Sequence, residues 1–335
     1  MSRFTVRRTL IAVLLATTAC VSLPAFASKE KPLIGFSIDD LSVERWARDR
    51  DYFVEAAKTL GAEVNVQSAA GDTAKQVSQI ENMISQKVDV LVIVPKDGPT
   101  LINVVKEAKK AGIKVIAYDR LIKSPDIDMY ISFDNERVGT MQGDALMKAM
   151  PKGGSVYLMS GDPGDNNAKL FLAGAKKMIE PRVKAGEIKI LGEQSVKDWS
   201  DQTALKIAEN VLTQFNNKID GFLAPNDGTA GGVIQALTAQ KLAGKVPVTG
   251  QDADLNGVKR IIAGTQTMTV YKSLRLIASE SAKLAVDLVK GVKTTHKTVM
   301  VDKVPSILLD PIVITKGNVD LLVKDNFYTK AQLGL

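Results

Sequence analysis

From residue 33 onward, short apolar runs alternate with longer amphipathic segments along the chain. The apolar runs are too short for helices and are bounded by glycine or polar residues, which is typical of strands buried in a parallel sheet. The longer segments repeat apolar residues at helical spacing. The expected strands cover 33–38, 62–67, 88–95, 114–118, 130–133, 155–160, 189–194, 219–224, 246–249 and 267–270. The expected helices cover 43–60, 74–85, 99–110, 168–179, 202–214, 229–239, 256–263 and 274–289.

This alternation of strands and helices occurs twice, once on each side of residues 132–135. Strands that alternate with helices form parallel, doubly wound sheets with right-handed crossovers. The pattern therefore predicts an α/β protein with two doubly wound parallel-sheet domains. Residues 132–135 are not a flexible Gly/Ser linker, which favours a structured hinge between the domains.

A cleaved export signal is expected in residues 1–27. The segment begins with three arginines, continues with an apolar stretch and ends in Ala25-Phe26-Ala27, a small-x-small cleavage site that leaves Ser28 as the first mature residue. A lipoprotein acylated at Cys20 is the weaker alternative, because Thr17 stands where such sites usually carry a large aliphatic residue. Cys20 is the only cysteine, so cleavage after Ala27 leaves no thiol for a disulfide or for catalysis.

The mature chain carries only a small excess of positive charge. Without the three arginines of the export signal, 41 basic and 37 acidic residues remain, a net charge of +4. Both signs are mixed along the helices and no basic block occurs, so nucleic acid is not an expected partner. No later apolar run approaches the length of a membrane span.

Most of the expected strands end in hydrogen-bonding side chains. Asp119 and Arg120 follow the strand at 114–118, and polar residues follow strands in the second half in the same way. In open α/β sheets the carboxyl ends of the strands meet at a crevice that binds ligands. A carboxylate that accepts and a guanidinium that donates can hold adjacent hydroxyls of an uncharged molecule. A structural ion pair at the strand end is the alternative for Asp119 and Arg120.

Each half of the mature chain contains one tryptophan, Trp46 and Trp199, near an expected strand end or helix start. Core packing is the usual role of tryptophan, but both lie among charged residues, at 44–48 and 197–201. Two flat apolar faces surrounded by polar groups suit a sugar ring, because its C–H faces stack on aromatic rings while its hydroxyls donate and accept. The sequence therefore favours a carbohydrate ligand.

Several kinds of chemistry lack the residues that they need. The only histidine, His296, lies in a hydrophilic segment and is expected to be solvated; no metal site, cofactor site or Ser-His-Asp triad is expected. Glycine-rich phosphate-binding motifs are absent. Residues 252–257 begin like a calcium loop but lack its bidentate glutamate, so Asp254 or Asn256 is expected to cap a helix. Carboxylate pairs such as Asp39-Asp40 leave a secreted glycosidase as the minority alternative.

Several longer blocks are distinctive, among them Tyr118-Asp119-Arg120, Asn226-Asp227 and Gly250-Gln251-Asp252. With the export signal and two wound domains, they resemble the periplasmic sugar-binding proteins of the ribose/galactose class, and most closely the members that supply D-xylose to an ABC transporter. The resemblance covers essentially the whole mature chain. The other blocks that carry it are 38–41, 44–46, 79–84, 117–120, 130–136, 165–171, 250–254 and 264–272.

The resemblance implies a type I periplasmic binding protein, with two domains joined by a three-segment hinge. It implies an N-terminal domain of 28–131 plus 273–300 and a C-terminal domain of 132–272 plus 301–335. Carried over residue by residue, it implies a sugar held by Arg45, Asp119, Arg120, Asn167, Asn226, Asp252 and Lys272, with Trp46 and Trp199 as stacking faces.

The function that the resemblance implies is capture of a monosaccharide, most closely D-xylose, in the periplasm and its delivery to the membrane permease of an ABC transporter. Neither enzymatic turnover nor a cofactor is implied, and a monomer is expected. A different pentose or a hexose, such as ribose, arabinose or glucose, is the alternative, with a chemoreceptor as an additional partner. A sugar-responsive repressor core shares this fold, but it would need N-terminal DNA-binding helices in place of the export signal.

Overall fold

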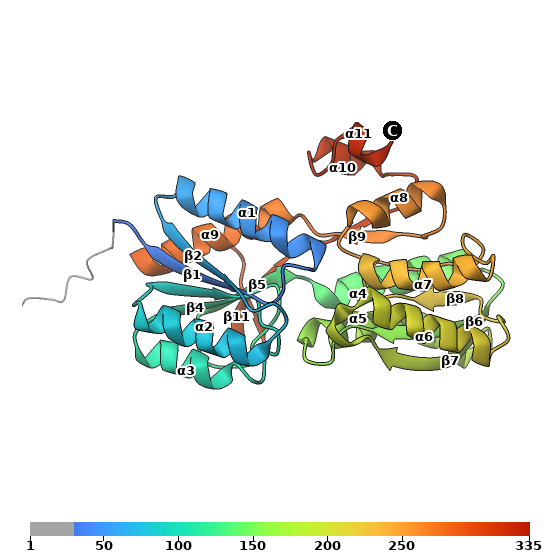
Figure 1. Ribbon diagram of the computed structural model, residues 1–335, viewed down its shortest axis with the longest axis horizontal. Helices are drawn as coiled ribbons and strands as arrows, with labels where there is room; N and C mark the ends of the chain where they lie inside the picture. The colour runs from blue at the N-terminus through green and yellow to red at the C-terminus, as the bar shows by residue number, and fades with distance from the viewer. Residues whose placement is uncertain (1–29) are drawn as a thin grey trace, which may run out of the picture.

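The computed structural model describes residues 30–335, which form two α/β lobes side by side (Figure 1). The expected export signal and Cys20 lie outside the described residues. We call the lobe that contains β1 the N-terminal lobe and the lobe that contains β6 the C-terminal lobe. Within residues 30–335, no helix is both long and apolar enough to cross a membrane.

A seven-stranded sheet with the order β10-β11-β5-β4-β3-β1-β2 forms the centre of the N-terminal lobe. All neighbouring strands are parallel except the pair β10–β11. The strands are β1 (Leu33–Ile38), β2 (Glu63–Ser68), β3 (Val90–Ile93), β4 (Lys114–Tyr118), β5 (Met129–Phe133), β10 (Val299–Val301) and β11 (Val304–Leu309). The central strands β1, β3, β4 and β5 are buried along almost their whole length, because helices cover both faces of the sheet.

Two pairs of helices cover this sheet. They are α1 (Glu44–Thr59) with α9 (Leu274–Lys290) on one face and α2 (Thr73–Ser85) with α3 (Ile102–Lys110) on the other. Phe53 of α1 and Ile277 of α9 pack in a core with Phe36, whereas Ile80 of α2 packs in a second core with Leu91. Alternate residues of each strand thus enter separate cores, which explains why these strands are apolar throughout.

The C-terminal lobe contains a parallel sheet of order β7-β6-β8 and an antiparallel ribbon of β9 and β12. Its strands are β6 (Gly154–Ser160), β7 (Ile188–Ser195), β8 (Gly221–Leu223), β9 (Thr269–Tyr271) and β12 (Ile312–Ile314). Its helices are α4 (Asn135–Ala149), α5 (Asn166–Lys184), η1 (Lys197–Trp199, a 3₁₀ helix), α6 (Asp201–Gln214), α7 (Asp227–Ala239), α8 (Leu255–Ala263), α10 (Asp320–Lys324) and α11 (Lys330–Leu333). The helices α4 and α5 pack so closely that a Cβ at Gly139 or Gly174 would overlap the backbone of the other helix.

Three connections cross between the lobes, from β5 to α4, from β9 to α9 and from β11 to β12. Strand β11 pairs with β5 in the N-terminal sheet, with Ile307 opposite Ile131. The boundary that the resemblance implies assigns all of 301–335 to the second domain, whereas residues 304–309 lie in the first sheet. Short extended runs in this tail do not specify their pairing partner, so only the tertiary structure identifies it.

Two local expectations also differ from the structure. The apolar pattern does not predict α4, whose buried positions include two glycines and the polar Gln142. A local indication was present, because the carboxylate of Asp134 caps this helix by accepting a hydrogen bond from the backbone N–H of Arg137 at 3.0 Å. Conversely, the expected strand at 246–249 makes only a single bridge, between Val248 and Phe222.

Candidate ligand-binding site

A polar cavity of about 300 Å³ lies where the two lobes meet. It is found beyond the carboxyl ends of parallel strands, as expected for open α/β sheets. The lining residues are Val43, Arg45, Trp46, Asp119, Arg120, Asp165, Asn167, Phe171, Trp199, Asn226, Gln251, Asp252 and Lys272.

All nine residues that the sequence analysis expects at the ligand line this one cavity, although they come from seven separate segments. Four further lining residues were missed, namely Val43, Asp165, Phe171 and Gln251. Asp165 and Gln251 belong to the polar stretches at expected strand ends, but neither was among the residues expected to hold the ligand. Phe171 lies one helical turn after Asn167 in α5, and sequence does not distinguish it from a core phenylalanine.

Arg45 is at the centre of a buried ion network. Its Nη2 lies 2.9 Å from Oδ2 of Asp119, its Nε 3.1 Å from Oδ2 of Asp49 and its Nη1 3.4 Å from Oδ1 of Asp252. Nζ of Lys272 lies 2.8 Å from the same oxygen of Asp252. Because Arg45 belongs to the N-terminal lobe and Asp252 to the C-terminal lobe, the network connects the lobes.

The opposite charges in this network hold Asp119 and Arg45 in their ionised forms. Burial alone would raise the pKa of Asp119, but Arg45, Lys272 and Arg120 outweigh burial and lower that pKa. Burial also opposes the charge of Arg45, yet Asp119 and the other carboxylates raise its pKa well above the ordinary value. Asp119 is therefore an anion at neutral pH, able to accept hydrogen bonds from a ligand.

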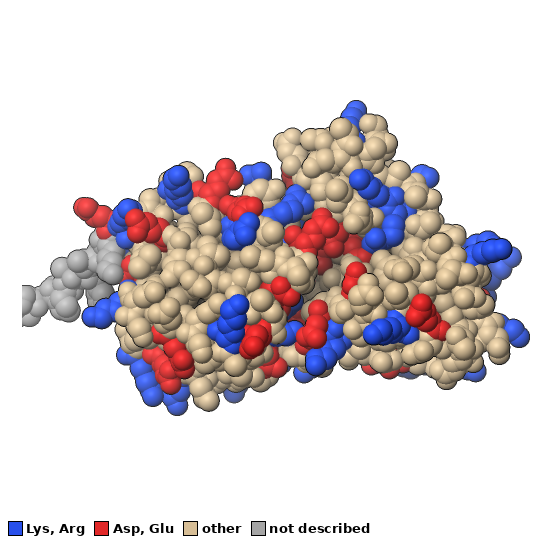
Figure 2. All heavy atoms as spheres, viewed as in Figure 1, with Lys and Arg blue, Asp and Glu red and all other residues tan. Residues whose placement is uncertain are grey.

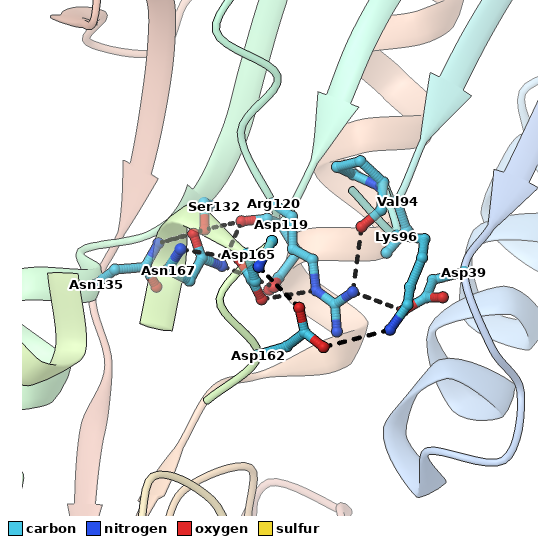
Figure 3. Close-up of polar contacts among 12 residues, drawn as sticks. Asp39, Val94, Lys96, Asp119, Arg120, Ser132, Asn135, Asp162, Asp165 and Asn167 are labelled. Atoms are coloured by element: carbon cyan, nitrogen blue, oxygen red, sulfur yellow. Dashed lines mark hydrogen bonds and ion pairs between the residues drawn. The ribbon is translucent and has the colours of Figure 1, made fainter. Parts of the chain in front are cut away.

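Arg120 forms a second bridge between the lobes (Figure 3). Its Nη1 donates to Oδ2 of Asp39 at 2.6 Å and to the carbonyl of Pro95 at 3.1 Å, and its Nε lies 2.8 Å from Oδ2 of Asp165. Asp165 also caps α5, since its Oδ1 accepts from the backbone N–H of Asn167 at 2.8 Å. Burial raises the pKa of Asp165 to about 6, although Arg120 acts to lower it.

Asn167 belongs to a chain of hydrogen bonds behind the cavity (Figure 3). Its Nδ2 donates to the backbone carbonyl of Asp119 at 2.9 Å, and its Oδ1 accepts from Nδ2 of Asn135 at 2.9 Å. The hydroxyls of Tyr130 and Ser132 donate to the same carbonyl of Asp119, at 2.9 and 2.7 Å. These bonds hold the backbone of Asp119 in place at the cavity.

Three lining residues have backbone angles in the left-handed region. The φ angles are 60° for Asp119, 89° for Asp252 and 54° for Trp199. Aspartate tolerates this region, but a bulky tryptophan rarely adopts it. Such strain persists only where the surrounding structure holds it, and it is concentrated at ligand sites in many proteins.

The two tryptophans form aromatic walls of the cavity. Trp46 is buried, with the guanidinium carbon of Arg45 4.2 Å and that of Arg120 5.3 Å from its ring centroid. Trp199 covers Gly161, where a Cβ would overlap the indole, and meets Phe171 edge-on with centroids 6.3 Å apart. Neither indole N–H has a hydrogen-bond partner among residues 30–335.

A wider depression of about 1150 Å³ adjoins the cavity and shares Val43, Trp199 and Asn226 with it. Figure 2 shows acidic side chains gathered around the hollow between the lobes. The charged residues that line the depression are Asp40, Glu44, Asp198, Asp201, Asp227, Asp254 and Arg260. Because most of these are acidic, the approach to the cavity disfavours anionic molecules.

Asp227 is a fully buried carboxylate behind Asn226. Its Oδ1 accepts from Nε2 of Gln266 at 2.6 Å, and its Oδ2 accepts from the hydroxyl of Thr269 at 2.8 Å and from the backbone N–H of Asp254 at 2.9 Å. Burial raises its pKa to about 7, and these hydrogen bonds offset only part of that effect. Asp227 thus joins α7, the 252–254 segment and β9 behind the cavity.

The raised pKa predicts that Asp227 makes the protein less stable as the pH rises. The folded state keeps the proton up to about pH 7, whereas the unfolded chain releases it near pH ~3.9. Between these values the folded state binds more protons, so the free energy of unfolding falls with increasing pH. We expect the free energy of unfolding in urea, measured from about pH 5 to about pH 8, to fall less steeply with pH for Asp227→Asn than for the wild type. Equal slopes for the two proteins would contradict this assignment.

Two further residues singled out in the sequence are clarified by the structure. Asp254 occupies the N-cap position of α8, but its side chain makes no capping hydrogen bond. His296 is partly buried and its Nε2 lies 2.7 Å from Oε2 of Glu280, so it is paired rather than simply solvated. Within residues 30–335, no cluster of three or more His, Cys, Asp or Glu residues is suited to a metal ion.

Two α/β lobes with a polar cavity between them define a two-domain ligand-binding protein. The sequence model of the periplasmic binding protein domain matches residues 34–293, and the chain belongs to this family. The prediction of a type I periplasmic binding protein fold is therefore confirmed. The protein is a binding protein rather than an enzyme, as the sequence analysis expects.

The chain is 54% identical to the D-xylose-binding periplasmic protein of Escherichia coli (strain K12), over 94% of this chain and 98% of that protein. It is 51% identical to the protein of the same name from Haemophilus influenzae, over 90% and 91% of the two chains. The structure of an ABC transporter solute binding protein from Clostridium phytofermentans with bound β-D-glucose is similar, with a TM-score of 0.83 and 35% identity over 90% of this chain and 99% of that one. The resemblance to periplasmic sugar-binding proteins is therefore confirmed.

Proposed function

We propose that this protein captures D-xylose between its two lobes in the periplasm and delivers it to the membrane permease of an ABC transporter. The observation that carries the proposal is the cavity between the lobes, which combines two tryptophans with a balanced set of charged side chains. Relatives whose names state D-xylose binding, at 54% and 51% identity, support the choice of sugar. The expected export signal at 1–27 supports the location.

The charges that line the cavity favour a neutral ligand rich in hydroxyl groups. Three cations, Arg45, Arg120 and Lys272, are matched by the carboxylates of Asp119, Asp165 and Asp252. A charged ligand would leave one uncompensated charge in a buried site, which is costly. Sugar hydroxyls donate to carboxylates and accept from guanidinium groups, and each buried group left unpaired costs about 1–3 kcal/mol. Affinity therefore depends on the position of every hydroxyl.

Sugar binding would act by favouring the closed arrangement of the lobes. Contacts that cross between the lobes converge on the cavity, including Arg120 with Asp165 at 2.8 Å and Asn167 with the carbonyl of Asp119 at 2.9 Å. A ligand that touches both walls has its full set of partners only when the lobes are closed, so it shifts the population toward that state. The three connections between the lobes provide the hinge for this movement.

The side chains that line the cavity favour a pentose over a hexose. Arg45 and Trp46 both line it and are both buried. A hexose carries an exocyclic CH₂OH group that these side chains would exclude. A hexose nevertheless remains the alternative ligand, because the similar structure from C. phytofermentans contains β-D-glucose.

Titration of the purified mature protein with D-xylose, ribose, arabinose, glucose and galactose tests the proposal. Calorimetry gives each affinity, and tryptophan fluorescence reports on the site directly because Trp46 and Trp199 both line the cavity. We expect D-xylose to bind most tightly, without turnover. A hexose that binds as tightly as D-xylose would contradict the assignment, and absence of binding to all five sugars would refute a role in sugar capture.

Lys96 is expected to slow the release of sugar. At the edge of the cleft, its Nζ in the N-terminal lobe lies 2.7 Å from Oδ1 of Asp198 and 3.5 Å from Oδ2 of Asp162, both in the C-terminal lobe. Because Asp198 is half exposed, the pair is worth about 0.5–1 kcal/mol. Lys96→Met should therefore increase the dissociation rate about 2- to 5-fold in stopped-flow fluorescence. A matched control is Lys148→Met, which removes an exposed ion pair within α4 and should leave the rate unchanged; equal rates for wild type and Lys96→Met would contradict the prediction.

A further inference from the structure

Three buried polar groups at the cavity have no partner in the protein. Within residues 30–335, five side chains contain a buried nitrogen or oxygen without a hydrogen bond. Three of these atoms, Nε1 of Trp46, Nε1 of Trp199 and Oε1 of Gln251, belong to residues that line the cavity. Because unpaired buried polar atoms are unfavourable and uncommon, their concentration here indicates that a ligand completes their hydrogen bonding.

Gln251 is fixed in position by the backbone on both sides. Its own carbonyl accepts from the backbone N–H of Asp227 at 3.0 Å, and the next backbone N–H, that of Asp252, donates to Val270 at 2.8 Å. The preceding Gly250 packs so closely against α7 that a Cβ would overlap the carboxylate of Asp227. The side chain of Gln251 is only 2% exposed, so it has little freedom to turn away from the cavity toward solvent.

The other acceptors around the cavity already have donors. Asp119 accepts from Arg45 at 2.9 Å, Asp165 from Arg120 at 2.8 Å and Asp252 from Lys272 at 2.8 Å. Oδ1 of Asn226 accepts from the backbone N–H of Thr229 at 2.9 Å. The amide of Gln251 differs from these groups, because it is neutral and its oxygen has no donor within residues 30–335. A hydroxyl matches it, because a hydroxyl can donate to the amide oxygen or accept from the amide nitrogen.

We propose that Gln251 determines sugar specificity by pairing with one particular hydroxyl of the bound monosaccharide. This inference rests on the proposed function. Asp119 and the other ionised groups provide strong, charge-assisted bonds, whereas Gln251 provides a neutral bond that discriminates by position. A sugar that lacks this hydroxyl, or carries it in the other configuration, leaves the amide oxygen without a donor.

Calorimetry with D-xylose and its 2-deoxy, 3-deoxy and 4-deoxy analogues tests this role. Gln251→Met keeps the length of the side chain but removes its hydrogen bonding, and we expect it to weaken D-xylose binding roughly 10- to 100-fold. We also expect Gln251→Met to bind one of the deoxy analogues with the same affinity as D-xylose. The wild type is expected to bind that analogue much more weakly than D-xylose. Gln251→Asn, which keeps the amide but withdraws it from the cavity, should show the same pattern.

A matched control is Gln79→Met, because Oε1 of Gln79 is also buried without a partner but lies on α2, outside the cavity lining. This variant should bind all four sugars as the wild type does. Unchanged D-xylose affinity in Gln251→Met, or an equal loss for D-xylose and every analogue, would overturn the inference and leave the proposed function intact. A wild-type protein that binds no monosaccharide would instead overturn the proposed function itself.

Discussion

Replacement of Asp119 by alanine is expected to weaken D-xylose binding by about 3–5 kcal/mol, or roughly two to four orders of magnitude. Asp119 is buried, ionised and 2.9 Å from Arg45. Its removal takes away an acceptor for the sugar and one of the buried carboxylates that balance the charges of Arg45 and Lys272. Calorimetric titration with D-xylose measures the change directly.

Backbone strain and charge can be separated at this position. The φ angle of Asp119 is 60°, a conformation that asparagine tolerates and alanine adopts only at a cost. Asp119→Asn should therefore keep the fold better than Asp119→Ala while still losing most of the affinity. Asp144→Ala removes an exposed carboxylate that pairs with Lys148, and it should bind D-xylose normally. Near-normal affinity in both Asp119 variants would argue against a ligand in this cavity.

Replacement of Arg120 by methionine is expected to lower both the stability of the closed protein and its affinity for sugar. Arg120 pairs with two buried carboxylates, Asp39 at 2.6 Å and Asp165 at 2.8 Å. When one partner of a buried ion pair is removed, the remaining charge is left uncompensated, which typically costs about 3–5 kcal/mol. Urea unfolding without sugar measures the change in stability. The same experiment with D-xylose measures the change in affinity, because the sugar raises the free energy of unfolding by an amount that depends on how tightly it binds.

The loss should depend on pH. The pKa of Asp165 is already raised to about 6 by burial, and loss of Arg120 removes the main charge that lowers it. Protonation below about pH 6 neutralises Asp165, so the penalty in Arg120→Met should shrink as the pH falls. Arg137→Met removes an exposed pair with Asp310 and should change stability by less than about 1 kcal/mol. If Arg120→Met lost no more free energy of unfolding than Arg137→Met, this would contradict the role of Arg120.

The elements of this fold were largely predictable because its strands are buried on both faces and its helices are amphipathic. The run at Lys114–Tyr118 forms β4 as expected, since an apolar stretch of this length has few alternatives in an α/β protein. Helix α4 was missed because α5 covers it closely through glycines, which leaves few large apolar residues to mark its buried face. The pairing of β11 with β5 was missed because partners distant in sequence leave no local trace.

The same contrast applies to the site. Asp119, Asn226 and Asp252 could be collected from the sequence because strand ends converge in this topology, a rule that needs no coordinates. Gln251 also stands at a strand end, but Phe171 could not be separated from a core phenylalanine by this rule. Its place in the cavity depends on how α5 is oriented, which is set by long-range packing.

The sequence by itself determined the class of fold, the absence of a catalytic histidine cluster and the choice of residues that could hold a sugar. These follow from local periodicity, composition and side-chain chemistry. Only the tertiary structure decided which carboxylate pairs with which cation, which tail strand joins which sheet and which polar groups stay unpaired. Such facts depend on distances of a few ångströms between segments far apart in the chain, and the free energy of each buried pair changes steeply over those distances.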